Sequence, residues 1–119
     1  MHGCILRHDV LTETVFQGLE CSNANFFAVV EFMADETKRL SVYEWNPRFV
    51  IQTGDANIDI RVSTSVKEWP NYEFDPVNNP KITLHIHKQI TLRQALDAVC
   101  EKAGFHWQSK GTYIQMFKR

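Results

Sequence analysis

The feature that most constrains the fold is a helix, predicted for residues 92–103, whose start and end are both marked in the sequence. Thr91 and Gln94 match a T-x-x-Q capping box, in which each side chain accepts a hydrogen bond from a backbone N–H at the helix start. Gly104 follows the helix and enters the left-handed conformation without steric cost. Apolar side chains recur at spacings of three and four along one stripe: Leu92, Ala95, Leu96, Val99, Cys100 and Ala103. We therefore expect a helix that buries this stripe in a core.

Segments typical of β-strands lie on both sides of this helix. Residues 81–87 alternate between two faces, with Ile82, Leu84 and Ile86 on one face and Thr83, His85 and His87 on the other. After the helix, residues 105–108 also alternate, Lys110 and Gly111 offer a tight turn, and residues 113–117 are rich in strand-forming types. Residues 81–119 are predicted to form a β-α-β-β unit with its helix on one face of a small mixed sheet.

The upstream half predicts a helix followed by a hairpin. Apolar side chains repeat at spacings of three and four between Asn25 and Leu40, with charged residues opposite, which indicates an amphipathic helix packed on a core. Two β-like runs, 48–53 and 58–62, flank the turn-rich sequence TGDAN. Residues 25–119 are therefore expected to form one α+β domain.

Composition limits the function classes. With 119 residues, 44% of them hydrophobic, the chain is long enough for one core and too short for two ordinary domains. A formal net charge of -1 with interspersed signs argues against a nucleic-acid partner. No apolar run has the length of a membrane span, and residues 1–20 lack the pattern of a secretory signal peptide.

Residues 1–24 are interpreted as an unstructured or non-native leader. The sequence ETVFQG resembles the recognition sequence of a viral 3C-type protease, and Ser22-Asn23-Ala24 resembles a common scar of expression vectors. A disulfide between Cys4 and Cys21 remains open, whereas Cys100 is expected in the buried stripe of its helix.

The segment NYEFDPVNNPKITLHIHKQITLRQALDAVCEKAGFHW, followed by a hairpin, resembles the short N-terminal domain shared by bacterial secretins and TonB-dependent transducers. The shared features are Asp75-Pro76 after a hydrophobic strand, a strand that opens KITL, a T-L-x-x-A-L-D helix start, and Ala-Gly-Phe before the hairpin. The resemblance covers roughly residues 70–119. Members of that family carry a first strand and helix before this unit, whereas residues 41–70 are predicted here as strands.

The resemblance implies a non-catalytic protein-interaction module in the periplasm or cell envelope, with a protein partner or a homo-oligomeric ring and no cofactor. Such a domain would offer an exposed edge strand, and the polar face beside it, to a partner chain. The strands 81–87 and 113–117 are the predicted contact surfaces. His85, His87, Tyr113 and Gln115 are the candidate contact residues.

The alternative is a small zinc-dependent binder or enzyme that uses a histidine face. His85 and His87 share one side of a strand, and His106 on the hairpin would complete three imidazole ligands, with Asp97 or Glu101 as a fourth ligand. The sequence contains no G-x-S-x-G, no H-E-x-x-H and no phosphate-binding glycine loop. We therefore expect that the protein is not an enzyme.

Overall fold

The computed structural model describes residues 11–40, 47–53, 56–60, 77 and 79–118. Helices and strands follow one another as β1 (Val15–Phe16), β2 (Leu19–Asn25), α2 (Phe26–Leu40), β3 (Arg48–Thr53), β4 (Ala56–Asp59), β5 (Lys81–Ile86), β6 (Ile90–Thr91), α3 (Leu92–Ala103), β7 (Phe105–Ser109) and β8 (Tyr113–Lys118). The two helices and the separate sheets confirm the expected α+β class.

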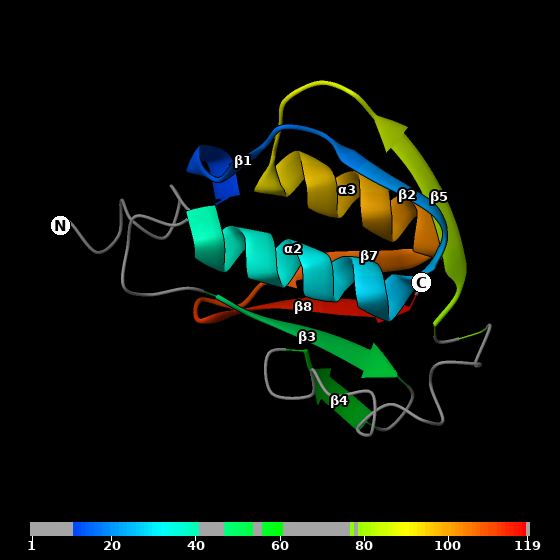
Figure 1. Ribbon diagram of the computed structural model, residues 1–119. Helices are drawn as coiled ribbons and strands as arrows, with labels where there is room; N and C mark the ends of the chain where they lie inside the picture. Colours follow the sequence, from blue (N-terminus) through cyan, green and yellow to red (C-terminus); the bar gives the residue numbers. More distant parts are fainter. Residues whose placement is uncertain (1–10, 41–46, 54–55, 61–76, 78, 119) are drawn as a thin grey trace, which may run out of the picture.

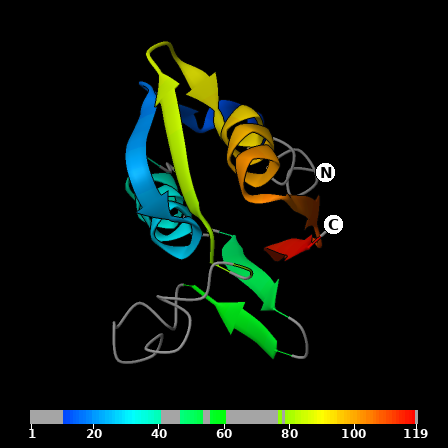
Figure 2. The same ribbon diagram turned by 90° about the vertical axis from the view of Figure 1, so that its right-hand side faces the viewer.

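Helices α2 and α3 lie between a four-stranded sheet and a two-stranded ribbon (Figures 1 and 2). The sheet has the strand order β4-β3-β8-β7 and is mixed, because β3 and β8 are parallel while the other neighbours are antiparallel. The ribbon pairs β2 with β5 in antiparallel fashion. Helix α2 packs on β2 and β3, and α3 packs on β5 and β7, so each helix contacts both layers.

Helix α3 begins and ends as the sequence predicts. The Gln94 N–H donates to the Thr91 hydroxyl oxygen at 3.2 Å, and the Thr91 N–H donates to the Gln94 side-chain oxygen at 2.9 Å, which completes the capping box. Gly104 adopts the left-handed conformation at φ 78°. The whole predicted stripe is buried: Leu92, Ala95, Leu96, Val99, Cys100 and Ala103.

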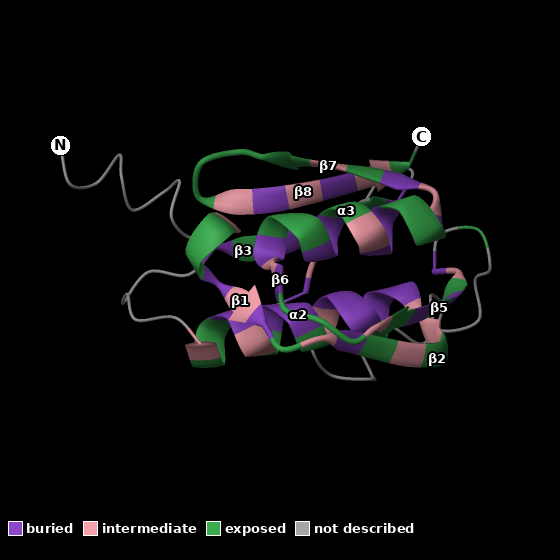
Figure 3. Cartoon of the chain, turned by 90° about the horizontal axis from the view of Figure 1, so that it is seen from above, coloured by how far each residue is buried: buried purple, intermediate pink, exposed green. Residues whose placement is uncertain are grey.

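The core lies between the helices and the strands on either side of them (Figure 3). Phe26 of α2 and Phe105 of β7 have ring centroids 4.5 Å apart, which joins the two halves of the chain through an aromatic pair. Ile82 and Leu84 of β5 are buried from the ribbon side, as the alternation in that strand predicts. The predicted helix over residues 25–40 and the hairpin of β3 and β4 are also present.

The interpretation of residues 1–24 as an unstructured leader is wrong for the part that the structure describes. Residues 19–25 form β2, which pairs with β5, and residues 15–16 form β1, which pairs with β6. Phe16 and Leu19 are buried in the core, with exposed fractions of 2% and 4%. The domain therefore extends upstream of residue 25, because β5 needs β2 to satisfy backbone groups along one edge.

The predicted β-α-β-β unit is present in order but not in one sheet. β5 belongs to the ribbon, whereas β7 and β8 belong to the four-stranded sheet on the other side of α3. In addition, β8 lies inside its sheet, between β3 and β7. Since both backbone edges of β8 are paired, this strand can contact a partner only through its side chains, and not as an edge strand.

Candidate functional site

The outward face of the β2–β5 ribbon carries the polar side chains that the sequence predicts as functional. In β5, Lys81, Thr83 and His85 are exposed, while Ile82 and Leu84 face the core. Glu20 of β2 lies directly across from His85 in the strand register. Strand pairing therefore places a carboxylate beside the histidine pair without help from any loop.

Glu20, His85 and His87 form one exposed cluster. Each offers a ligand atom, and these atoms all lie within 4.8 Å of one another. The His85 Nδ1 atom is 3.1 Å from the Glu20 Oε2 atom. The rings of His85, in β5, and His87, one residue beyond its end, lie nearly parallel, with an interplanar angle of 8° and centroids 6.4 Å apart.

The structure does not bring His106 into this cluster. His106 lies on β7, in the four-stranded sheet, where its ring is 5.6 Å from the ring of Phe117. Asp97, expected as a fourth ligand, instead accepts a hydrogen bond from the Trp107 indole N–H at 2.8 Å. Glu101 is exposed on α3 and does not belong to the cluster either. The three-histidine site that the alternative interpretation requires is therefore not assembled, because its members belong to separate layers of the fold.

Glu20 is the member of the cluster that sequence reasoning missed. It was set aside with residues 1–24 as part of a leader. A signal was nevertheless present, because the apolar positions Phe16, Leu19 and Cys21 surround it in a short pattern typical of a strand.

A bulge in β2 shapes the same ribbon. The register with β5 shifts between Cys21 and Ala24, and Asn23 adopts a positive φ of 53°. The Asn23 N–H donates to the Thr83 hydroxyl oxygen at 2.9 Å, which satisfies a backbone donor that the bulge removes from the ladder. Asn tolerates this conformation better than most residues.

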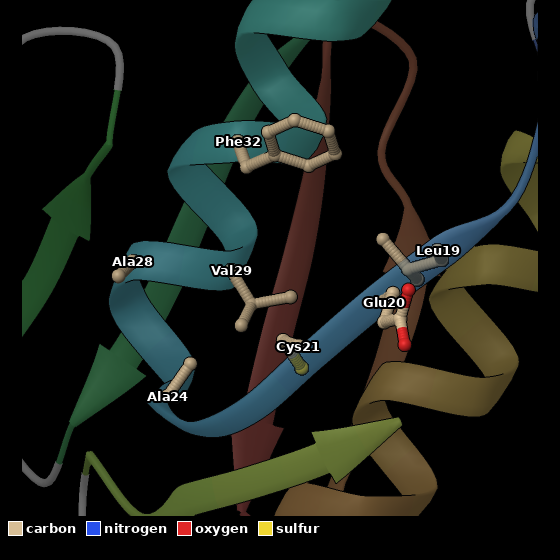
Figure 4. Close-up of a pocket in the computed structure, with 7 residues that line it drawn as sticks. All are labelled: Leu19, Glu20, Cys21, Ala24, Ala28, Val29 and Phe32. Atoms are coloured by element: carbon tan, nitrogen blue, oxygen red, sulfur yellow. The ribbon is translucent and has the colours of Figure 1, made fainter. Parts of the chain in front are cut away.

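A mostly apolar pocket of about 200 Å³ lies between β2 and α2. Figure 4 shows Cys21 of β2 and Val29 of α2 on its two sides, with Phe32 at one end. Phe32 is 49% exposed, which is unusual for so large an apolar side chain. The Cys21 thiol donates to the Ile82 carbonyl at 3.7 Å. Cys4, the other cysteine of the disulfide that the sequence leaves open, lies outside the described residues.

Tyr113 and Gln115 share a second surface, on the sheet face that points away from the helices. They line a hollow of about 350 Å³ together with residues of β3 and β4. The Arg48 guanidinium lies 5.9 Å from the centre of the Tyr113 ring and 3.4 Å from the Asp59 carboxylate. The Gln115 amide donates to Gln52 at 3.3 Å. The four predicted contact residues thus lie on two separate surfaces, with the histidines on the ribbon.

None of the helices in the described part of the chain is both long enough and apolar enough to cross a lipid bilayer. Comparison of the chain with family models, with curated proteins and with solved structures returned no match.

Proposed function

We propose that the chain is a non-catalytic protein-interaction module of the bacterial cell envelope, with a role like that of the short N-terminal domain of secretins and TonB-dependent transducers. The observation that carries the proposal is the edge of β5. Among the described strands, β5 pairs only with β2, and none of the others covers its second edge, where a strand of a partner chain would pair.

The order of elements supports this proposal. Members of the family carry a first strand and helix before the unit that this sequence resembles. In this fold, the short strand β1 is followed by β2 and α2, and β5, the short strand β6, α3, β7 and β8 come later in the chain. The hairpin of β3 and β4 lies between the two groups in sequence.

The side chains of β5 are compatible with the addition of a partner strand and disfavour edge-to-edge aggregation with other chains. Lys81 and His85 are exposed on a short strand, and charged or polar side chains on an edge disfavour pairing with arbitrary chains. The buried residues Ile82 and Leu84 fix the strand on the core. A partner strand would gain backbone hydrogen bonds at the open edge, while the outward side chains select its sequence.

Site-specific crosslinking in the source cells tests this edge. A photo-reactive amino acid replaces Lys81 on β5 or, as a matched control, Lys102 on α3, since both lysines are exposed. We expect a protein adduct of defined size from position 81 and none from position 102. An adduct twice the mass of the protein would identify a second copy as the partner. Failure to crosslink at position 81, or equal adducts at both positions, would contradict the proposal.

Cell fractionation tests the proposed location. An antibody against residues 81–119 should detect the protein in the envelope fraction, as part of a longer chain. A band near 13.9 kDa that is confined to the cytoplasmic fraction would remove the envelope role.

A further inference from the structure

We propose that Glu20, His85 and His87 bind a divalent transition-metal ion on the outward face of the β2–β5 ribbon, and that Zn²⁺ is the ion that this ligand set fits. The inference does not depend on a docking partner, because all three ligands come from one chain. It also differs from the three-histidine site of the alternative interpretation, because Glu20 takes the place of His106.

The spacing of the ligand atoms is close to what one ion requires. Two ligands of a tetrahedral zinc ion at about 2.0–2.1 Å from the metal lie about 3.3 Å apart. The His85 Nδ1 and Glu20 Oε2 atoms are already 3.1 Å apart, and the three ligand atoms of the cluster lie within 4.8 Å of one another. Small rotations of exposed side chains are sufficient to close the remaining difference.

The backbone positions the ligands, although their side chains are exposed. Glu20 and His85 face each other across paired strands whose other faces are buried through Leu19 and Leu84. Gly18 packs against the end of β5, where an added Cβ would lie 2.8 Å from the Ile86 carbonyl oxygen. This close approach holds the backbone beside His87, so Glu20 and His85 lie on paired strands and His87 directly follows the last residue of β5.

The donor types select the class of ion. Two imidazole nitrogens and one carboxylate suit zinc, copper or nickel, whereas calcium and magnesium require mostly oxygen ligands. Three protein ligands leave one tetrahedral position for water. A hollow of about 390 Å³, lined in part by Gly18, Glu20 and His87, lies beside the cluster and gives that position access to solvent.

An ordinary surface ion pair accounts for only part of this arrangement. An ion pair between Glu20 and His85 would explain their 3.1 Å contact, but a pair this exposed contributes little to stability. It gives no role to His87, whose ligand nitrogen also lies within reach. A metal ion engages all three side chains at once and competes with protons for the imidazoles.

Calorimetric titration of the full chain with Zn²⁺ at pH 7.5 tests the site. We expect one ion per chain, with affinity reduced at least tenfold in His85→Ala, in His87→Ala and in Glu20→Gln. His106→Ala serves as the matched control and should bind as the wild type does, because this histidine lies in the other sheet. Circular dichroism of the metal-free variants should match the wild type, since all these side chains are exposed.

Nuclear magnetic resonance gives the position of the ion. Zinc should shift the backbone amide signals of residues 19–21 and 84–88 and leave those of residues 105–109 unchanged. Absence of zinc uptake by the wild type would overturn the proposal. Uptake that persists unchanged in His85→Ala, or shifts that occur only elsewhere in the chain, would overturn it as well.

Discussion

The backbone N–H of Phe27 donates a hydrogen bond to the side-chain Oδ1 of Asn79 at 2.8 Å, across 52 positions of sequence. The Phe26 N–H donates to the Pro80 carbonyl, also at 2.8 Å. Asn25 occupies the position before α2 where a capping side chain is usual, yet its Oδ1 has no hydrogen-bond partner in the part of the chain that the structure describes. The start of α2 is therefore capped by the segment that leads into β5.

Replacement of Asn79 by Ala should lower the free energy of unfolding by about 1–2 kcal/mol, because a buried helix-start N–H loses its acceptor. Asn25→Ala is the matched control and should cost much less, since the Asn25 Oδ1 accepts no bond. Urea denaturation monitored by circular dichroism measures both values. Equal losses in the two variants would show that Asn79 does not act as the cap.

Gly18→Ala should destabilise the protein by about 1–3 kcal/mol, through strain at an unusual backbone conformation and a clash with the neighbouring strand. Gly18 has a φ of 151°, and its added Cβ would lie 2.8 Å from the Ile86 carbonyl oxygen. Gly111→Ala separates these two causes, because Gly111 has a φ of 87° and a Cβ added there would meet no described atom of a non-adjacent residue within 4 Å. Thermal unfolding should rank Gly18→Ala as the more harmful change. The reverse ranking would show that the contact at Ile86 is not tight.

Leu96→Asp should abolish cooperative folding, because Leu96 is fully buried on α3 and a carboxylate at that position would have no partner. Lys102→Asp places the same side chain at an exposed position of the same helix and should cost about 0.3–1 kcal/mol through the helix dipole. Near-ultraviolet circular dichroism reports the tertiary packing around the aromatic residues. A folded Leu96→Asp protein would mean that the stripe of α3 is not the core.

Local signals predicted the helices and most strands correctly, because those signals lie within a few residues of what they determine. The structure contains the capping box at Thr91 and the left-handed Gly104, which set the start and the end of α3. It also contains the alternation through Ile82 and Leu84, which sets the buried face of β5. The bounds of α3 follow directly from its own residues.

The pairing of strands that lie far apart in the sequence could not be predicted from such local signals. Nothing in the sequence of β5 indicates that its partner is β2 rather than β7, since either strand satisfies the same backbone groups. That choice places Glu20, and not His106, beside His85. The sequence ETVFQG resembles a protease recognition sequence, yet its Phe16 is buried in the core next to the strand that supplies the carboxylate.

Two glutamates on α2 should give the stability of the protein opposite dependences on pH. Burial, and then the negative charge of Asp35, raise the pKa of Glu31 above 4.5, so the folded state binds this proton more tightly than the unfolded state. Its contribution to stability is therefore lost as pH rises through the raised pKa. A hydrogen bond from the Arg39 side chain lowers the pKa of Glu36, whose contribution is present above 4.5 and is lost as pH falls through the lowered value.

At pH 7, Glu31→Gln should therefore stabilise the protein and Glu36→Gln should destabilise it, each by a few tenths of a kcal/mol, roughly the magnitude of charge pairs on a helix surface. Both differences from the wild type should shrink toward zero at about pH 2–3, where carboxyl groups with ordinary pKa values are protonated. Urea denaturation of the three proteins at several pH values measures this. Changes of the same sign in both variants would contradict the argument, because burial of Glu31 and the Arg39 bond to Glu36 act on ionisation in opposite directions.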